Sequence, residues 1–407
     1  MMNILIITRD TQYNSNIKGH FLRLDGFIDY CKFKKLNIDV IYPFRLFGGK
    51  KTRSAFNPLF SFWSFFDYDG LINANILLKL ILSPFKFLRR LFNTKIDSDE
   101  LILKSLEKKI KKLKKKKYDI IIVSVPPHSF LNLINLLSRL STNSIKIADC
   151  RDPWTLRPDL YKNNENMREL ETSLLLKYDY VSVVSEGMKN NYEKNFNIQN
   201  VITLENGYPN WMEKFPQKKK FTNFENLKFG YFGFGGIYYA SKSGKDLSLL
   251  CNFFEYCEKV KKAKLYLHGT IINKSRKKFK NTIIQSSVFN TRLIQAYDNM
   301  DVAIYYYTGS DAELTMGAKL YEYLQRDKFI WSITKVWPTS LYRFSEKVGG
   351  VFITDLSKTN LEEDYDKMLE KLKLFKGRDK NVIKNYSRQN LNENFFNCIK
   401  KKSNDIK

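Results

Sequence analysis

Residues 118–127, YDIIIVSVPP, give the clearest strand signal in the chain, because the run is apolar on both faces. Strands rich in Ile and Val on both faces are typical of a parallel sheet that helices cover on either side. Similar short runs recur, and most are followed by a turn signal and a helical pattern. The predicted strands are 3–8, 37–43, 118–127, 146–152, 178–185, 201–207, 227–233, 264–270, 281–287, 301–307, 328–333 and 349–355.

This alternation predicts the α/β fold class, organised as two doubly wound, Rossmann-like domains. We place the first domain at 1–208, a polar and basic linker with two prolines at 209–226, and the second domain at 227–375. The remaining segment, 376–407, is expected to hold one final helix over 381–402, with a return to the first domain as one arrangement. Parallel sheets bind ligands at the carboxyl ends of their strands, so we expect the two sheets to face each other across a cleft.

The 407-residue chain is strongly basic, with a formal net charge of +27 from 69 Lys and Arg against 42 Asp and Glu. Such a charge indicates a polyanionic partner, which includes nucleic acid, anionic lipid and phosphate-bearing substrates. A compositional bias toward lysine would give the same charge without a function, so both interpretations stay open. The lysine runs lack interleaved aromatic residues and no nucleic-acid recognition motif occurs, which speaks against a specific nucleic-acid partner.

Cysteine usage and the N-terminus favour a cytoplasmic protein. The five cysteines are widely spaced, and the chain enters a predicted strand directly at MMNILIIT. The three histidines have no cysteine at metal-ligand spacing, so we expect no metal site.

No apolar run of 18 residues occurs, so no membrane-spanning helix is predicted. An apolar segment at 71–92 is closely followed by a lysine-rich one at 104–119. Paired apolar and polybasic signals are typical of peripheral membrane proteins, which would place 71–117 on the inner face of the cell membrane. The alternative is a helical hairpin packed on the domain with its lysines in solvent.

Six motifs follow one another along the chain: VSVPPHS, ADCRDPWT, ELETSLLLKYDYVSVVSEGM, LENGYP, FGYFGFGG and MGAKLYEYL. In this order they resemble the GT-B fold glycosyltransferases of the large family-4 type, over nearly the whole chain. The resemblance implies transfer of a sugar, with retention, from a nucleotide-diphospho-sugar to a glycan or lipid-linked saccharide in cell-surface polysaccharide synthesis. It also implies that the nucleotide sugar is a co-substrate, that no cofactor or metal is needed, and that no obligatory protein nucleophile exists.

The motif MGAKLYEYLQ, 316–325, is expected to bind the donor. Gly317 and Ala318 are small residues near a helix start, where free backbone N–H groups attract an anion, and Lys319 adds a charge for a diphosphate. The resemblance assigns Glu322 to the ribose hydroxyls. The alternative is a capped amphipathic helix with a surface Lys and Glu.

One position departs from the family pattern. An earlier glutamate of many members falls here on Leu314. Glu313 or Asp311 would then substitute for it, or the donor sugar would be held differently.

A glycine-rich turn, FGYFGFGGIYYASKSGKDL at 229–247, is the second donor motif. Gly235 and Gly236 permit close approach of the backbone to a ligand. Lys242 and Lys245 are expected to clamp the diphosphate and stabilise the charge of the leaving group. The alternative is a flexible loop with solvated lysines. Neither a Walker A loop nor GxGxxG is present, so a dinucleotide cofactor is not supported.

The segment KIADCRDPWT, 146–155, carries unusual charge at the end of a predicted strand. We expect the charges of Asp149, Arg151 and Asp152 to point away from the core, and the resemblance places them on the acceptor side. Asp152 would orient an acceptor hydroxyl or act as its base, and Trp154 would offer a flat apolar face to a sugar ring or lipid. The alternative is a structural pair of Arg151 with one of the aspartates.

Gly19 and His20 end the first strand-to-helix loop. The resemblance assigns Gly19 to the donor diphosphate and His20 to the acceptor. The alternative for His20 is an ordinary surface residue. Asp152, Lys245 and Glu322 are the predicted catalytic residues. Two other readings remain beside this one: a basic nucleic-acid-binding protein, and a fold relative with other chemistry, such as a sugar-nucleotide epimerase or an inactive scaffold.

Overall fold

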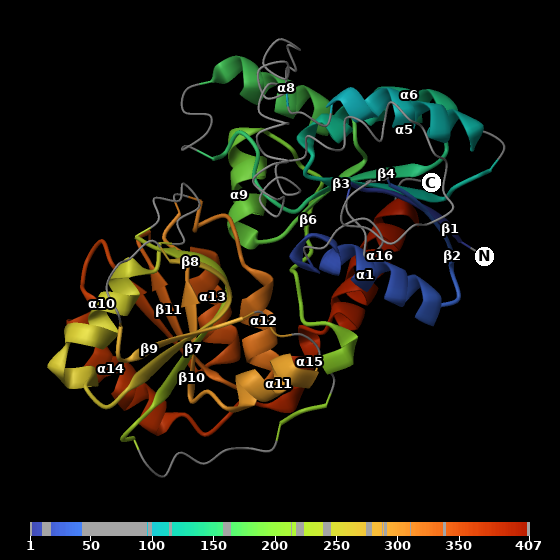
Figure 1. Cartoon of the computed structure of the whole chain (residues 1–407). Coiled ribbons are helices and arrows are strands. Elements are labelled where there is room, and N and C mark those ends of the chain that lie inside the picture. The colour runs from blue at the N-terminus through green and yellow to red at the C-terminus, as the bar shows by residue number, and fades with distance from the viewer. Residues whose placement is uncertain are drawn as a thin grey trace, which may run out of the picture. The chain divides into compact units, whose positions relative to one another are not determined.

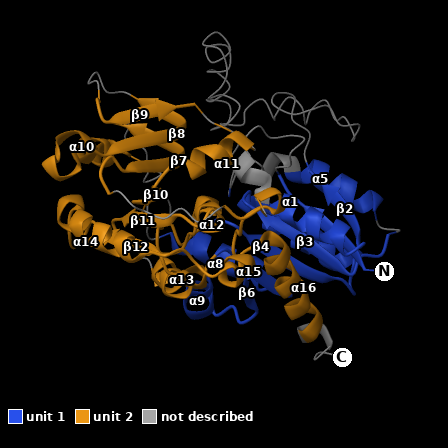
Figure 2. Ribbon diagram, turned by 90° about the horizontal axis from the view of Figure 1, so that it is seen from below, with its two compact units in different colours: residues 1–154, 164–184, 189–204 blue, residues 155–163, 185–188, 205–407 orange. Residues whose placement is uncertain are grey.

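A computed structural model of the chain divides into two compact units, coloured separately in Figure 2. Unit 1 comprises Met1–Trp154, Asn164–Val184 and Lys189–Leu204, and unit 2 comprises Thr155–Asn163, Ser185–Met188 and Glu205–Lys407. The structure describes residues 2–9, 18–42, 96, 100–113, 116–157, 164–212, 214–216, 224–238, 246–273, 279–286, 288, 291–309, 311–336 and 339–404.

Unit 1 contains a six-stranded sheet in the order β2-β1-β3-β4-β5-β6, and every neighbouring pair is parallel (Figure 1). The strands are β1 (Asn3–Ile7), β2 (Asn37–Ile41), β3 (Ile120–Val125), β4 (Ile145–Cys150), β5 (Tyr180–Val183) and β6 (Val201–Thr203). The helices are α1 (Lys18–Phe33), α5 (Glu100–Lys112), η1 (His128–Leu133), α6 (Ile134–Leu140), α8 (Glu165–Leu175) and α9 (Glu186–Asn195), of which residues 186–188 of α9 belong to unit 2. All six residues of β3 are buried, as the run of Ile and Val on both faces predicts.

Unit 2 contains a second parallel sheet in the order β12-β11-β10-β7-β8-β9. The strands are β7 (Lys228–Ile237), β8 (Lys264–Asn273), β9 (Thr282–Gln285), β10 (Val302–Tyr306), β11 (Phe329–Thr334) and β12 (Val351–Asp355). The helices are η2 (Asn210–Met212), α10 (Ser248–Tyr256), η3 (Glu258–Val260), α11 (Thr291–Asp298), α12 (Ala318–Gln325), α13 (Thr339–Val348), α14 (Leu361–Leu374), α15 (Lys380–Asn385) and α16 (Arg388–Asn404).

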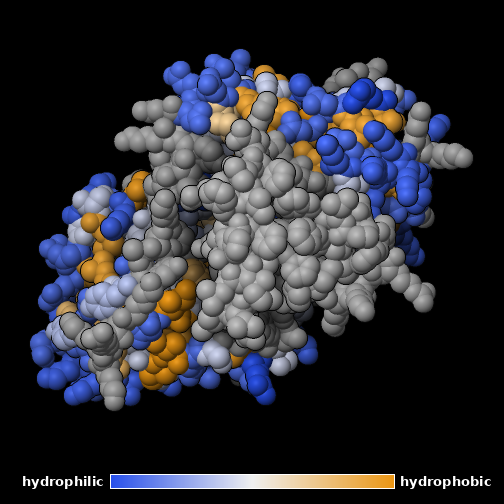
Figure 3. Space-filling model, turned by 45° about the horizontal axis from the view of Figure 1, so that its top comes forward, coloured by the Kyte–Doolittle hydropathy of each residue, from blue (hydrophilic) through white to orange (hydrophobic). Residues whose placement is uncertain are grey.

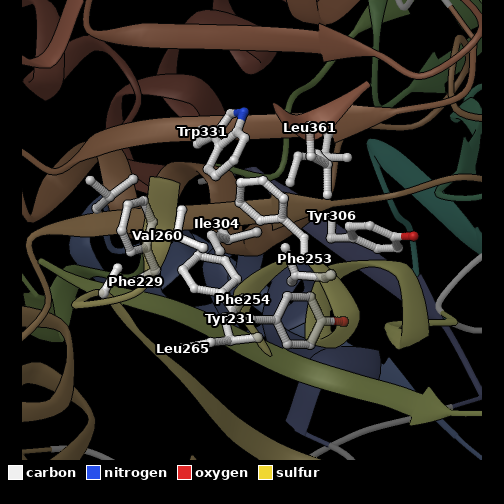
Figure 4. Close-up of a cluster of buried hydrophobic side chains, with 14 of the residues drawn as sticks. Phe229, Tyr231, Phe253, Phe254, Val260, Leu265, Ile304, Tyr306, Trp331 and Leu361 are labelled. Atoms are coloured by element: carbon white, nitrogen blue, oxygen red, sulfur yellow. The ribbon is translucent and has the colours of Figure 1, made fainter. Parts of the chain in front are cut away.

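Two apolar clusters cover the two faces of the sheet of unit 2. Successive strand residues point to opposite faces, so Tyr231 joins one cluster and Phe232 the other. The first cluster, shown in Figure 4, packs β7, β10 and β11 against α10 and α14, with Phe254 and Trp331 fully buried. The second packs the other face against α11, α12, α13 and α15. This double covering is the doubly wound arrangement that the sequence predicted.

The structure confirms all twelve predicted strands, with ends that differ by a few residues. The single final helix predicted over 381–402 is wrong, because two helices, α15 and α16, occupy this segment. Between them the backbone pairs with Tyr208: the Tyr208 N–H donates to the carbonyl of Tyr386, and the Arg388 N–H donates to the carbonyl of Tyr208. These bonds replace helical ones at the break.

The lysine-rich segment is partly described. Helix α5 buries Leu106 and Ile110 and leaves Lys104, Lys108 and Lys111 exposed, so this part packs on the domain with its lysines in solvent. In Figure 3, hydrophilic side chains, drawn in blue, cover much of the outer surface of the coloured residues. The apolar segment 71–92 lies outside the described residues. No helix in the described part of the chain is long and apolar enough to cross a bilayer.

Candidate functional site

Asp149 lies near the carboxyl end of β4, and its side chain is only 1% exposed. Its carboxylate accepts a hydrogen bond of 2.6 Å from Nη2 of Arg23 on α1. Ser182 and Ser124, its register partners on β5 and β3, donate to it at 2.6 and 3.2 Å. The expectation that this charge points away from the core is therefore wrong. Three protein groups donate hydrogen bonds to the Asp149 carboxylate, which is typical of a buried structural ion pair.

The next residues of the motif differ in exposure. Arg151 is half-buried and donates from Nη2 to the carbonyl of Pro126 at 3.0 Å. Asp152 is exposed, so of the two aspartates only Asp152 is available to a ligand. Trp154 is 1% exposed, and its ring stacks on His128 with the centroids 5.1 Å apart. The expected free face of Trp154 is therefore wrong, because packing covers the indole.

Cys150 ends β4 beside these groups, and burial raises the pKa of its thiol well above the usual value. It therefore stays protonated at neutral pH and is a poor nucleophile. Glu171 of α8, also buried, accepts a hydrogen bond of 2.7 Å from the hydroxyl of Tyr192. The Glu171 carboxylate therefore makes a polar contact between α8 and α9.

In unit 2, the loop from β10 to α12 carries the first donor motif. Gly317 is the N-cap residue of α12, and its N–H donates to the hydroxyl of Tyr305 at 2.9 Å. Ala318 is the first residue of the helix. Burial raises the pKa of Tyr305 to about 12, so the hydroxyl remains neutral. The sequence did not indicate this contact between Tyr305 and the helix start.

The same loop contains Leu314 and the two carboxylates predicted to substitute for the missing glutamate. Leu314 itself is buried, and Glu313 is exposed. Asp311 is 5% exposed and accepts a hydrogen bond of 2.6 Å from the hydroxyl of Tyr307. Arg157 adds an ion pair to Asp311 at 3.8 Å. Of the two candidate substitutes, only Glu313 has a carboxylate open to solvent.

Lys319 and Glu322, on the first turns of α12, form a polar cluster with Tyr297 of α11. The ammonium of Lys319 lies 2.7 Å from Oε2 of Glu322 and 3.0 Å from the hydroxyl of Tyr297. The Tyr297 hydroxyl also donates to the same Glu322 oxygen. Glu322 is 2% exposed, whereas the side chain of Lys319 is 35% exposed. The alternative of a surface Glu is therefore wrong, and Lys319 is the solvent-facing member of a buried cluster.

The glycines of the motif predicted as a turn lie in the last part of strand β7. Gly235 and Gly236 are buried and pair with Ile271 and Ile272 of β8, beyond the residues that pair with β10 and β9. Two facing glycines, Gly233 and Gly269, lie two register positions before Gly235. A Cβ on Gly269 would lie 1.9 Å from the carbonyl oxygen of Gly233, so only glycine permits this approach of the strands.

The roles of the other predicted site residues remain predictions. Lys242 and Lys245 lie outside the described residues. Gly19 and His20 fall in the first turn of α1, and their side chains are outside the described part. The described residues contain no group of His, Cys, Asp and Glu that would hold a metal ion.

Glu205 was not singled out by the sequence analysis. Burial raises its pKa to about 7, against the opposing attraction of Lys347. A carboxylic acid that titrates near neutral pH is one that can exchange protons under working conditions. Its only signal in the sequence is its place within the LENGYP motif.

No family model matches the chain, and no curated protein matches it. Solved structures match it over nearly the full length of both chains. An α,α-trehalose-phosphate synthase (UDP-forming) from Burkholderia xenovorans is 10% identical, with coverages of 98% and 100% and a TM-score of 0.62. A lipopolysaccharide outer core galactosyltransferase is 12% identical, with coverages of 98% and 100% and a TM-score of 0.57.

A third match is a candidate UDP-N-acetylglucosamine 2-epimerase from Listeria monocytogenes, at 8% identity, coverages of 98% and 96% and a TM-score of 0.52. At such identities a structural likeness speaks for the fold and not for the chemistry. The chain therefore has the fold of these proteins, in which two Rossmann-like α/β domains follow one another.

Proposed function

We propose that the protein is a glycosyltransferase that moves a sugar from a nucleotide-diphospho-sugar to a glycan or lipid-linked saccharide, with retention. The observation that carries the proposal is the cluster that Lys319 and Glu322, at the start of α12, form with Tyr297 of α11. It combines a solvent-facing cation with a helix N-terminus, and such a pair attracts a diphosphate. The solved transferases that share this fold support the assignment.

In this proposal the chemistry is divided between the two units. In unit 2, Lys319, the Gly317 end of α12 and the predicted Lys242 and Lys245 hold the diphosphate and stabilise the leaving group. The resemblance assigns Glu322 to the ribose, but its carboxylate is buried against Lys319 and Tyr297, so in this proposal it holds the Lys319 ammonium at the helix start. Glu313 takes the place of the carboxylate missing at Leu314. In unit 1, the exposed Asp152 orients the acceptor hydroxyl or accepts its proton. No metal is needed in this scheme, because ammonium groups neutralise the departing diphosphate.

The cell-surface role remains part of the proposal. A lipid-linked acceptor would require contact with the inner face of the membrane, and the exposed lysines of α5 support such a contact through 71–117. Co-flotation of the chain with anionic vesicles tests it, and a variant without 71–92 is expected to float less.

The test of the donor site is a titration with UDP and with GDP. At a concentration of about one hundred times Kd, the matching nucleotide is expected to raise Tm by about 5 °C. Lys245→Ala and Glu322→Ala should each abolish this shift. Lys367→Ala, at an exposed lysine paired with Asp364, is the matched control and should keep it. A shift that persists in both site variants would contradict the site assignment.

A sugar-nucleotide epimerase is the second candidate, because one solved structure of this fold is described as such and because Leu314 departs from the transferase pattern. Incubation with a panel of nucleotide sugars separates the two. A transferase releases nucleoside diphosphate when membrane extract supplies an acceptor. An epimerase converts the sugar nucleotide to its isomer with no acceptor present.

A further inference from the structure

A depression of about 460 Å³ opens on unit 2 at the amino-terminal ends of β11 and β12. Phe329 and Val351, the first residues of these strands, line it together with Gly349 and Gly350 and the end of α14. Figure 2 shows β11, β12, α13 and α14 within the orange unit. The predicted donor residues belong to the carboxyl ends of the strands, at the opposite edge of the sheet. This depression is therefore separate from the proposed donor site.

The floor of the depression is a built structure around Arg378. The buried guanidinium donates to the carbonyls of Gly349 and Gly350 at 3.0 and 2.9 Å and pairs with Asp327 at 3.3 Å. The ring of Phe375 packs against it with 4.9 Å between the guanidinium carbon and the ring centroid. A Cβ on Gly350 would lie 2.3 Å from that ring. The floor is therefore closely packed.

The rim combines an apolar side chain with unpaired positive charge. Leu374, the last residue of α14, is 73% exposed. Lys371 and Lys376, which precede and follow Leu374 in the sequence, also line the depression, and both are exposed. In the described part of the chain neither lysine has a carboxylate partner. A basic last turn stabilises the helix dipole, which accounts for Lys371. It does not account for Lys376, which lies beyond the helix, or for the exposure of Leu374.

We propose that this rim, defined by Lys371, Leu374 and Lys376, docks unit 2 on an anionic lipid surface. The two ammonium groups bind lipid phosphates, and Leu374 inserts at the boundary between headgroups and acyl chains. A soluble phosphate ligand would engage the lysines and leave Leu374 in water, so the exposed leucine favours lipid. The site is independent of the proposed contact through 71–117 and of the proposed transferase activity.

The test uses the full chain and vesicles of phosphatidylcholine with and without phosphatidylglycerol, with binding measured by co-sedimentation. Lys371→Glu/Lys376→Glu is compared with Lys261→Glu/Lys262→Glu. The control lysines of unit 2 are exposed, lie on a turn and change the net charge equally. We expect the rim variant to lower the partition coefficient on anionic vesicles about tenfold or more, and the control variant to lower it clearly less. Leu374→Ser, which keeps the charge, should also weaken binding.

Equal losses in the two double variants would overturn the proposal, because binding would then follow net charge alone. Unchanged binding of Leu374→Ser would overturn it as well. A third arm adds inorganic phosphate without lipid. If phosphate raises Tm of the natural chain but not of the rim variant, while both bind vesicles equally, the rim is a site for free phosphate and the lipid assignment is wrong. Thermal unfolding of each variant verifies that the fold is retained.

Discussion

The guanidinium of Arg23 lies 2.6 Å from the carboxylate of Asp149, and both side chains are buried, although 126 positions separate them in the sequence. Arg23 also donates to the carbonyl of Leu204, so the pair ties α1 to β4 and to the end of β6. A buried pair of this kind is destabilising to break, because one charge is left without a partner.

Asp149→Asn is therefore expected to lower the free energy of unfolding by about 3–5 kcal/mol. Urea denaturation followed by circular dichroism measures the change. Asp152→Asn, three residues later and exposed, is the matched control and should change stability by less than about 0.5 kcal/mol. Similar losses in the two variants would contradict the structural role of the pair.

Asp152→Asn is also expected to affect turnover. If Asp152 accepts the proton of the acceptor hydroxyl, its loss should lower kcat about 10²–10⁴-fold. Binding of the nucleotide should not change, because Asp152 is not one of the predicted donor residues. Single-turnover transfer assays and nucleotide titrations measure the two effects. An equal loss of nucleotide affinity would place Asp152 in donor binding instead.

The fold could be predicted because each strand is marked by a short local run of residues. The site could be predicted less well because its contacts join residues that are far apart in the sequence. Runs such as IIIV in β3 and FIWSIT in β11 mark buried strands by composition alone. The charge of Asp149 gives no such indication, since a buried ion pair and an exposed ligand site use the same residue. Its partner Arg23 sits on another element, and Tyr297 lies 25 residues before Glu322. Spacing along the chain does not report such pairs.

Tyr297→Phe tests the cluster that Tyr297 forms with Lys319 and Glu322. The hydroxyl donates to a buried carboxylate, and a hydrogen bond to a charged group contributes about 1.5–3 kcal/mol. We expect the variant to lose about 2 kcal/mol of stability and to weaken nucleotide binding, because Glu322 is then held by Lys319 alone. Tyr238→Phe removes an exposed hydroxyl bonded to Asn252 and should leave both unchanged. Nucleotide binding that survives in Tyr297→Phe would separate the cluster from the donor site.

Glu205 predicts a pH dependence of stability. Burial raises its pKa from 4.5 to about 7, so between these values the folded state binds more protons than the unfolded state. Stability should therefore fall as pH rises from about 4.5 to about 7 and should not change further through this group above that range. Glu205→Gln should remove this part of the slope and stabilise the chain at pH 8 by about 3 kcal/mol. Parallel slopes for the variant and the natural chain would contradict the raised pKa.

Gly269→Ala tests the close approach of β7 and β8. The new Cβ would meet the Gly233 carbonyl oxygen at 1.9 Å, and the φ of +143° is one that side chains rarely adopt. Because both groups belong to the backbone, the strands must separate, and we expect a loss of more than about 3 kcal/mol. Gly349 has a φ of +65°, but a Cβ added there would meet open space. Gly349→Ala should therefore lower the free energy of unfolding by only about 1 kcal/mol. Urea denaturation measures both variants. Equal losses would mean that backbone conformation, and not the contact between the strands, requires glycine at Gly269.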